Sequence, residues 1–228
     1  FTDVAKTSWF AGFVDYCAST GVVNGVGDGK FDPNGQLTGY QFAKMLLVAL
    51  GYDAKIEGFT GADWQINVSK RADQADLFDN LDISGNAALT REQAAQMCLN
   101  TIKAPLVEYS NKGGNISING AEINIGASKA EYVTTTLAQA QRISKRTLTN
   151  TLFTNKGGYT VEFGEKYYSN LYLTADNDAL GRPANTWTLG TKDIGTYTDA
   201  STLVLTYENE SVKGKDVYSD IGYSAISD

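Results

Sequence analysis

The stretch GVGDGKFDPNGQLT, residues 25–38, leads directly into an apolar segment that runs from Tyr40 to Leu50. Four glycines and one proline favour tight turns here, because glycine adopts positive φ and proline fixes its own φ. We expect Phe31, a bulky apolar side chain within the loop, to pack into a core. Thr38 has the features of a helix N-cap, and Gln41 three residues later completes a capping box. The stretch therefore predicts a loop followed by an amphipathic helix.

A further helix is predicted upstream of this loop, from about Trp9 to Ser19. Apolar residues recur there at helical spacing, and Gly21 stands where helices favour glycine after their last turn. The apolar stripe consists of Phe10, Phe13, Val14 and Cys17. Residues 1–54 are thus expected to form a helix–loop–helix unit, with its second helix ending at Gly51.

This unit resembles the S-layer homology family. The family pattern is F-x-D-V, an aromatic residue at the first helix, then G-x-G-D-G-x-F-x-P and L-T before the second helix. The chain has FTDV at residues 1–4, Trp9-Phe10, and the loop at residues 25–38. Family members are bacterial cell-surface proteins whose repeats usually come in threes. The resemblance implies a pseudo-threefold helical bundle, and it implies a third repeat upstream of residue 1.

A second, degenerate copy of the unit is predicted over residues 55–105. LTREQ at residues 89–93 matches LTGYQ at residues 37–41, an offset of 52 residues. Trp64 takes the place of Trp9 at the start of a first helix. Similarity at a fixed offset indicates a structural repeat. The copy also predicts a helix over Ile66–Ala75 and a capping box formed by Thr90 and Gln93.

Residues 106–228 predict a β-rich segment of about four to seven strands, so the fold class is α+β. Isoleucines alternate with polar residues over residues 115–125 around Asn119-Gly120, which indicates a hairpin with a two-residue turn. The other expectations are strands around Tyr159, Val161 and Phe163 and around Leu203, Leu205 and Tyr207, a helix over Glu131–Ile143, and hairpin turns at residues 111–114 and 155–158.

The composition excludes several classes of protein. A net charge of −7 argues against nucleic-acid binding, since few cations are available to displace phosphate counterions. No apolar run is long enough to span a bilayer. The chain has no histidine, which removes the commonest member of catalytic triads and zinc sites. Cys17 and Cys98 are predicted to be small buried apolar residues rather than a disulfide or a reactive pair.

The resemblance also implies a binding site. Family members bind the secondary polysaccharide of the bacterial cell wall, often through a ketal pyruvate, and a T-R-A-E motif opens the second helix. Thr90, Arg91 and Glu92 match this motif, whereas Gly39 replaces its arginine in the first repeat. A helix N-terminus favours anions, and arginine grips a carboxylate with two hydrogen bonds. The glycan-binding residues that the resemblance implies are Trp9, Asp28, Gly29, Thr38, Gly39, Thr90, Arg91 and Glu92.

Simpler interpretations compete at several of these positions. Arg91 is equally compatible with an ion pair to Glu92 or Asp82 on the surface. Trp9 and Trp64 are predicted mainly as core residues where helices meet. Gly39 indicates either a lost anion site or a surface on which a sugar can lie.

No metal or cofactor is expected. Asp28, Asp32 and Asn34 fit turn and cap positions better than a calcium loop, because Lys30 and Gln41 stand at the first and twelfth ligand positions. The acidic cluster at residues 176–178 is interpreted as a loop.

The preferred function is non-covalent anchoring of a surface protein to an anionic wall polysaccharide, outside the cell, without enzymatic activity or membrane insertion. One alternative is a scaffold in a surface layer, with copies of itself or other surface proteins as partners. The other is a glycan-binding or wall-hydrolysing module in the second half. It would use Glu162 and Glu165 as paired carboxylates, with Arg182 and Trp187 as contacts.

Overall fold

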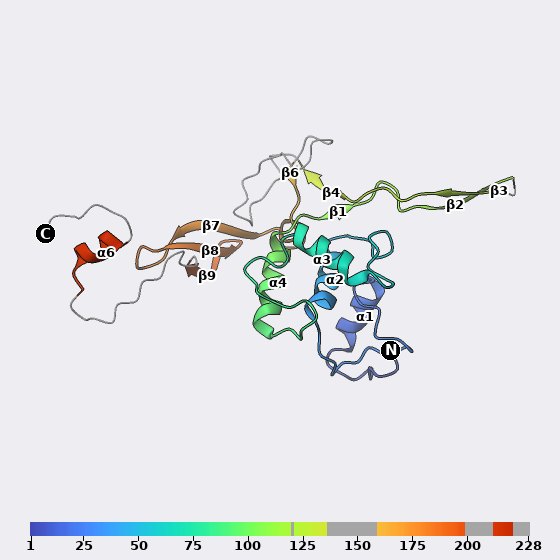
Figure 1. Cartoon of the computed structure of the whole chain (residues 1–228), viewed down its shortest axis with the longest axis horizontal. Coiled ribbons are helices and arrows are strands. Elements are labelled where there is room, and N and C mark those ends of the chain that lie inside the picture. The colour runs from blue at the N-terminus through green and yellow to red at the C-terminus, as the bar shows by residue number, and fades with distance from the viewer. Residues whose placement is uncertain (120, 136–158, 199–211, 221–228) are drawn as a thin grey trace.

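The computed structural model describes residues 1–119, 121–135, 159–198 and 212–220. The chain is α+β, with a helical N-terminal part followed by a β-rich part (Figure 1). Its helices are α1 (Ala11–Ser19), α2 (Gly39–Ala49), α3 (Trp64–Gln74), α4 (Arg91–Lys103), α5 (Phe163–Tyr167) and α6 (Gly214–Asp220). Its strands are β1 (Val107–Glu108), β2 (Gly114–Ile118), β3 (Ala121–Ile125), β4 (Glu131–Tyr132), β5 (Thr134–Thr135), β6 (Tyr159–Thr160), β7 (Leu171–Asn177), β8 (Pro183–Leu189) and β9 (Lys192–Thr198).

The opening FTDV sequence holds the glycine-rich loop in place. The Asp3 carboxylate accepts hydrogen bonds from the backbone amides of Phe31 at 2.8 Å and Asp32 at 2.7 Å. The hydrogen bond from the Phe31 amide lowers the pKa of Asp3. The amide of Thr2 also donates to the carbonyl of Gly29 at 2.8 Å. The two halves of the sequence motif are therefore joined by backbone contacts.

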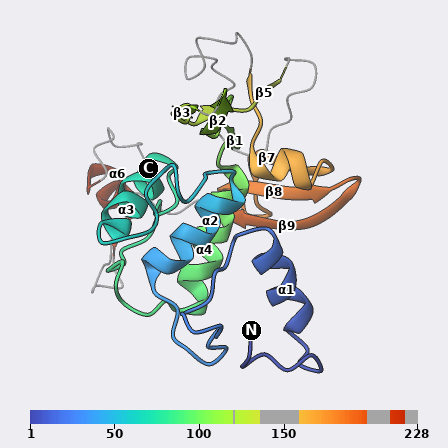
Figure 2. The same cartoon turned by 90° about the vertical axis from the view of Figure 1, so that its right-hand side faces the viewer.

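The hydrophobic core is formed by α2, α3, α4 and the segments that connect them, and α2 and α4 lie side by side (Figure 2). Its largest fully buried side chains are Leu47, Leu50, Phe59, Val68, Leu77 and Met97. Helix α1 contributes one buried residue, Val14, which is outside this cluster. The core therefore joins the second helix of the first repeat to the whole of the second repeat.

The core continues past the predicted boundary at residue 105. Leu106 and Val107 belong to the buried cluster, and the Val107 amide donates to the carbonyl of Leu50 at 2.9 Å. Three extended segments meet there through backbone hydrogen bonds between Leu106, Val133 and Val161, each 2.9 Å long. The start of the β-rich part is thus packed against the ends of α2 and α4.

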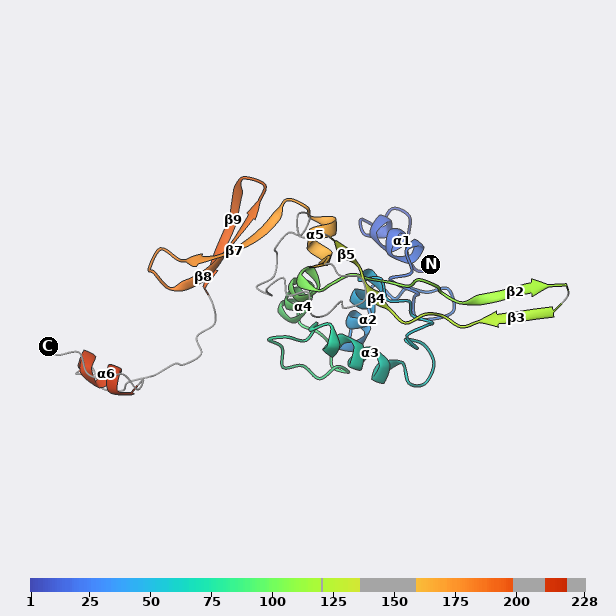
Figure 3. The same ribbon diagram turned by 90° about the horizontal axis from the view of Figure 1, so that it is seen from above.

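Two β structures extend from opposite sides of the helical body (Figures 1 and 3). The antiparallel pair β2 and β3 forms a long hairpin on one side. The antiparallel sheet β7–β8–β9 lies on the other side, with a register shift between Trp187 and Thr188. The predicted hairpin is confirmed, and Asn119 at its turn has a φ of 51°.

Other predictions for the second half were wrong. Residues 131–135 form β4 and β5 instead of the start of a helix, because their backbones pair with residues 107–108 and 159–160. Phe163 begins α5, so the strand predicted there ends at Thr160. The described residues contain nine short strands, more than the four to seven expected.

The Asn-Lys-Gly-Gly sequence at residues 111–114 is not a hairpin turn. Asn111 lies in the stem of the hairpin, where its backbone and side chain bind Ser128 and the carbonyl of Gly126. The predictions for residues 136–143, for residues 155–158 and for Leu203, Leu205 and Tyr207 lie outside the described residues.

Three predictions of burial also need correction. Phe31 is half-buried against Phe1, with ring centroids 5.6 Å apart, and it does not reach the main core. Cys98 is exposed and Cys17 is half-buried, and both are free thiols. Cys98 faces outward because the buried face of α4 is set by Met97, Asn100 and Thr101.

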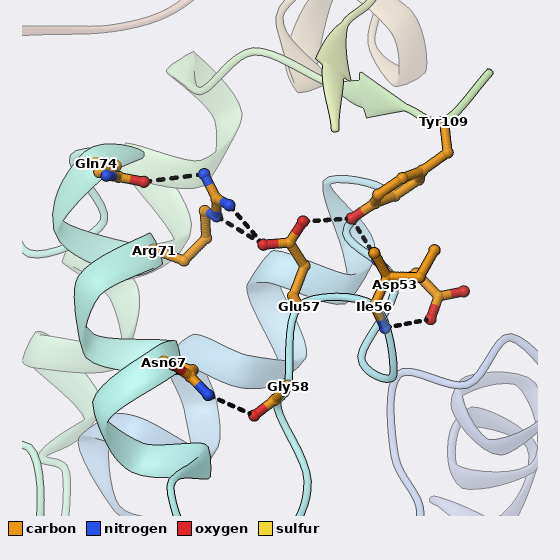
Figure 4. A network of polar contacts seen from close by, with 8 residues as sticks. All are labelled: Asp53, Ile56, Glu57, Gly58, Asn67, Arg71, Gln74 and Tyr109. Carbon is orange, nitrogen blue, oxygen red and sulfur yellow. Dashed lines mark hydrogen bonds and ion pairs between the residues drawn. The ribbon is translucent and has the colours of Figure 1, made fainter. Parts of the chain in front are cut away.

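A polar network attaches the base of the β2–β3 hairpin to the second repeat (Figure 4). The Glu57 carboxylate accepts two hydrogen bonds from Arg71, at 2.5 and 3.0 Å, and one from the Tyr109 hydroxyl at 2.8 Å. The Tyr109 hydroxyl in turn accepts from the amide of Asp53 at 3.1 Å. The Arg71 guanidinium lies over the Tyr52 ring, 5.1 Å from its centroid. One carboxylate thus links three segments that are distant in the sequence.

This network predicts a loss of stability in alkaline solution. Burial raises the pKa of Tyr52 from 10.0 to about 12 and also raises the pKa of Tyr109. Between pH 10 and 12 the folded chain keeps a proton that the unfolded chain has lost. The stabilisation that Tyr52 contributes is therefore complete below pH 10 and is lost as the pH rises from 10 through about 12. We expect the free energy of unfolding to fall by up to about 1.4 kcal/mol per pH unit for one such group.

Urea unfolding between pH 8 and pH 11.5 measures this slope. Tyr52→Phe should make the slope shallower, because it removes one of the two phenols. Tyr16→Phe changes a tyrosine that is exposed on α1 and serves as the control. Equal slopes in the unaltered chain and Tyr52→Phe would show that the Tyr52 phenol does not contribute to the alkaline loss of stability.

Candidate functional site

Both predicted capping boxes are present at the starts of α2 and α4. The Thr38 amide donates to Gln41 Oε1 at 2.9 Å, and the Gln41 amide donates to Thr38 Oγ1 at 3.4 Å. The corresponding distances between Thr90 and Gln93 are 2.9 and 3.1 Å. The two helices therefore begin with the same local geometry, 52 residues apart, as the repeat predicts.

The starts of these two helices are also joined to each other. Thr38 and Ala88 form an antiparallel bridge, and the Leu89 amide donates to the carbonyl of Leu37 at 2.8 Å. The amides of Gly39 and Tyr40 donate to carbonyls of the second repeat, those of Ala87 at 3.3 Å and Gly85 at 2.8 Å. In the first turn of α2, the amides of Gly39 and Tyr40 are thus bound by the neighbouring repeat, and the amide of Gln41 is bound by Thr38. This turn has no N–H group left for an anion.

Gly39 is buried by this contact. A Cβ atom at Gly39 would lie 3.2 Å from the Cα of Gly85 and from the side chain of Ile83. At Gly85 an added Cβ would collide with the ring of Tyr40. The glycine that replaces arginine in the first repeat is thus explained by close packing between repeats. The structure leaves no exposed surface at Gly39 on which a sugar can lie, which corrects that prediction.

The start of α4 is open. Arg91 and Glu92 are exposed, and in the part of the chain that the structure describes their backbone N–H groups have no partner. The Arg91 guanidinium likewise makes no ion pair among those residues, so the predicted pairing with Glu92 or Asp82 is not found. The positive end of the α4 dipole and the exposed Arg91 cation therefore lie together at the surface.

A shallow groove of about 440 Å³ runs beside the first turns of α4. It is lined by Asn80, Leu81, Asp82, Glu92, Gln93, Ala95, Gln96 and Leu99. The exposed acidic residues Asp82 and Glu92 line it, and Leu81 and Leu99 provide apolar surface. Sequence reasoning missed this groove because one of its walls, residues 80–82, comes from the degenerate loop of the second repeat, which has no family motif.

The remaining predicted site residues lie elsewhere. Asp28 and Gly29 are exposed in the glycine-rich loop, with φ angles of 49° and 70°. Trp9 is 84% exposed, so the prediction of a core tryptophan was wrong. Its ring contacts only Phe10 and Phe13 among the described aromatic side chains. No hydrogen bond or ring contact of the described residues joins these three to Thr90 or Arg91.

Glu162 and Glu165 do not form the opposed carboxylate pair that a glycosidase needs. Glu165 accepts a hydrogen bond from the Glu162 amide at 2.9 Å, and the two residues form the capping box of α5. They lie at one helix start and are not opposed across a cleft. Arg182 is held by Asp178 through contacts of 2.6 and 2.7 Å, which makes residues 178–182 a closed structural loop.

The described ranges were also searched for metal-ligand clusters and for membrane-spanning helices. No cluster of three or more potential metal ligands converges within them. None of their helices combines the length and the apolar character needed to cross a membrane.

The comparisons with known proteins agree with the motif geometry. Residues 1–43 match the S-layer homology domain. The "Middle cell wall protein" of Brevibacillus brevis is 31% identical over 116 residues, 51% of this chain and 10% of that protein. The "Cell surface protein" of Thermoanaerobacter kivui is 30% identical over 146 residues, 64% of this chain and 18% of that protein.

A weaker match is an enzyme, "Endo-1,4-beta-xylanase A" of Thermoanaerobacterium saccharolyticum. It is 28% identical over 103 residues, 42% of this chain and 9% of the enzyme. The chain thus spans less than a fifth of the length of each of these relatives. No solved structure matches the chain. The chain therefore carries an S-layer homology domain at its N-terminus, and its homologues include cell-surface and surface-layer proteins.

Proposed function

We propose that the chain anchors a cell-surface protein non-covalently to an anionic polysaccharide of the bacterial wall. The observation that carries this proposal is the contrast between the two helix starts. The neighbouring repeat occupies the N–H groups of α2, whereas the start of α4 presents unpartnered N–H groups beside an unpaired Arg91. The α4 start is thus the place where an acidic sugar substituent has both a dipole and a bidentate donor available.

The residues take separate roles in this proposal. Arg91 and the backbone amides of Arg91 and Glu92 contact the anion. Thr90 fixes the first turn through its capping box, and Thr38 holds the two repeats in register through its bridge to Ala88. The groove beside Glu92 supports the proposal, because a sugar next to the anionic group has a place to lie. A second, separate contact with the polysaccharide is proposed at Trp9, Asp28 and Gly29.

Co-sedimentation with purified wall sacculi tests this function. Binding should be lost when acid treatment strips the secondary polymers from the sacculi. Arg91→Ala should weaken binding by about 10- to 100-fold, since it removes hydrogen bonds between charged groups. Lys70→Ala is the matched control, because it removes one exposed positive charge from α3.

The outcomes separate the alternatives. Binding that survives stripping would show that the polymer is not the ligand. An equal loss in Lys70→Ala and Arg91→Ala would mean that net charge, and not the α4 start, determines binding. No binding to either kind of sacculus would overturn anchoring by this chain alone, and would leave either an anchor that needs a further repeat or a scaffold role.

A further inference from the structure

The two repeats of the chain meet in an interface in which α3 packs on α2. Three residues on one face of α3 make this contact. Trp64 lies against Lys44 of α2, whose Nζ atom is 5.7 Å from the ring centroid, and Val68 is fully buried in the core. The Arg71 guanidinium lies over the ring of Tyr52, just after the end of α2. The first helix of the second repeat is thus covered by the second helix of the first.

Helix α1 is the counterpart of α3 in the first repeat, 55 residues earlier in the sequence. Both helices end with the same backbone geometry. The Val22 amide donates to the carbonyl of Cys17 at 2.9 Å, and the Leu77 amide donates to the carbonyl of Ala72 at 2.9 Å. This shared helix end fixes which residues of the two helices correspond.

The α1 residues that correspond to the contact face of α3 are all exposed. They are Trp9, Phe13 and Tyr16, with exposed fractions of 84%, 68% and 69%. The Trp9 and Phe13 rings contact each other with centroids 6.4 Å apart, so these residues form an uncharged aromatic face. Helices α1 and α3 lie on different sides of α2 (Figures 2 and 3). Within the described residues, the aromatic face of α1 therefore lacks the helix that covers its counterpart.

Helix α4 is the counterpart of α2, and its matching face is also open. The α2 residues on the side of α3 are Ala43, Lys44 and Leu47, and the residues 52 positions later are Ala95, Gln96 and Leu99. All three of these α4 residues line the groove of about 440 Å³. Ala43 and Leu47 are fully buried, whereas Ala95 is exposed and Leu99 is half-buried. The groove is therefore the open α4 version of the surface on which α2 receives α3.

We propose that the aromatic face of α1 on one copy of the chain packs into the α4 groove of a second copy. The two surfaces are the two halves of an interface that the chain already forms within itself, and every copy carries both of them. Phe13 is larger than its counterpart Val68, and the open groove gives the larger ring room. The charges also match, because the exposed Lys6 precedes the aromatic face while Asp82 and Glu92 line the groove.

The contact is heterologous, because each copy contributes a different surface, and it joins copies head to tail. The three exposed rings can bury about 300–500 Å² on one copy. A similar area of the groove gives a total of roughly 600–1,000 Å², the size of a transient interface. At about 0.15 M salt, the repulsion between chains of net charge −7 is screened beyond about 8 Å. We therefore expect a dissociation constant on the order of 0.1 mM.

This association does not rest on wall binding. A second copy in the groove occupies the place in which a sugar would lie beside Glu92, so docking and sugar binding are alternative states of one α4 groove. Association is therefore measured without wall material, and its failure leaves the test with sacculi unaffected.

Sedimentation equilibrium of the whole chain between about 10 μM and 1 mM tests the proposal. The mean mass of the unaltered chain should rise with concentration. Phe13→Glu should abolish the rise because it places a charge on the aromatic face, and Ala95→Glu should abolish it because it places a charge in the groove. Cys98→Glu is the matched control: it adds the same charge at an exposed position of α4 that does not line the groove, and it should associate like the unaltered chain.

An equimolar mixture of Phe13→Glu and Ala95→Glu identifies the surfaces that meet. The first variant keeps its groove and the second keeps its aromatic face, so the mixture should form pairs and nothing larger, which also shows that both variants fold. The proposal is overturned if the unaltered chain stays monomeric at about 1 mM, because a different partner then covers the two surfaces. It is equally overturned if Phe13→Glu or Ala95→Glu alone associates as well as Cys98→Glu, or if the mixture stays monomeric.

Discussion

Replacing Gly51 with alanine should lower the free energy of unfolding by at least about 3 kcal/mol. Gly51 ends α2 with a φ of 107°, a conformation that residues with a side chain rarely adopt. Its amide donates to the carbonyl of Val48 at 3.0 Å, and the next amide, of Tyr52, donates to Leu47 at 3.1 Å. These two bonds form a Schellman motif. An added Cβ would also collide with the carbonyl oxygen of Val107. The alanine Cβ would therefore cause both the backbone strain at residue 51 and the collision with Val107.

The collision occurs where the β-rich part begins, since the Val107 amide is bonded to the carbonyl of Leu50. Urea unfolding should show a midpoint lowered by roughly 1–2 M. Gly12→Ala is the control: Gly12 lies inside α1 with open space around it, so alanine there should be neutral or stabilise by up to about 1 kcal/mol. A midpoint for Gly51→Ala within 0.3 M of the unaltered chain would contradict the argument.

The parts of the fold that were predictable are those set by local chemistry. Thr38 and Thr90 cap their helices because the threonine hydroxyl accepts from the glutamine amide three residues later, while the glutamine side chain accepts from the threonine amide. The hairpin follows from alternating isoleucines around an Asn-Gly pair. Neither inference needs any knowledge of the rest of the chain.

The wrong predictions concern residues whose secondary structure or burial is determined by tertiary contacts. Residues 131–135 become strands because residues 107–108 and 159–160 offer backbone partners, which no local pattern reveals. Trp9 is a bulky aromatic residue and was expected inside, but α1 is largely outside the core that α2, α3 and α4 share. The pattern shows which residues are apolar. It does not show which of them find a partner.

The candidate site was predictable in part for the same reason. Arg91 follows a recognisable cap, so sequence alone places it at a helix start. That α2 is closed depends on the loop at residues 84–88 lying across it, and the pairing of Gly39, Tyr40 and Gly85 has no motif. The repeat predicts two equivalent helix starts, and packing between the repeats makes them unequal.

Arg71→Ala should destabilise the chain by about 2–3 kcal/mol, the second large effect. The Glu57 side chain is 9% exposed and receives two of its three side-chain hydrogen bonds from Arg71. Removing the guanidinium leaves a nearly buried carboxylate with the Tyr109 hydroxyl alone. Breaking a fully buried ion pair costs about 3–5 kcal/mol, and the value is smaller here because the Arg71 side chain is 33% exposed.

A double-mutant cycle separates this pairing from simple loss of packing. Arg71→Met with Glu57→Gln removes both charges while keeping the volume and a hydrogen-bond acceptor for Tyr109. The double variant should therefore be more stable than Arg71→Met alone, with a coupling energy of about 1–2 kcal/mol by urea unfolding. Additive single effects would show that Arg71 contributes only through packing on Tyr52.

Because Tyr109 begins the stem of the β2–β3 hairpin, Arg71→Ala should also speed amide exchange in that stem. It should leave the α4 start, and wall binding through Arg91, intact. If Arg71→Ala removed both the exchange protection of the stem and wall binding, the hairpin and the helical body would fold as one cooperative unit.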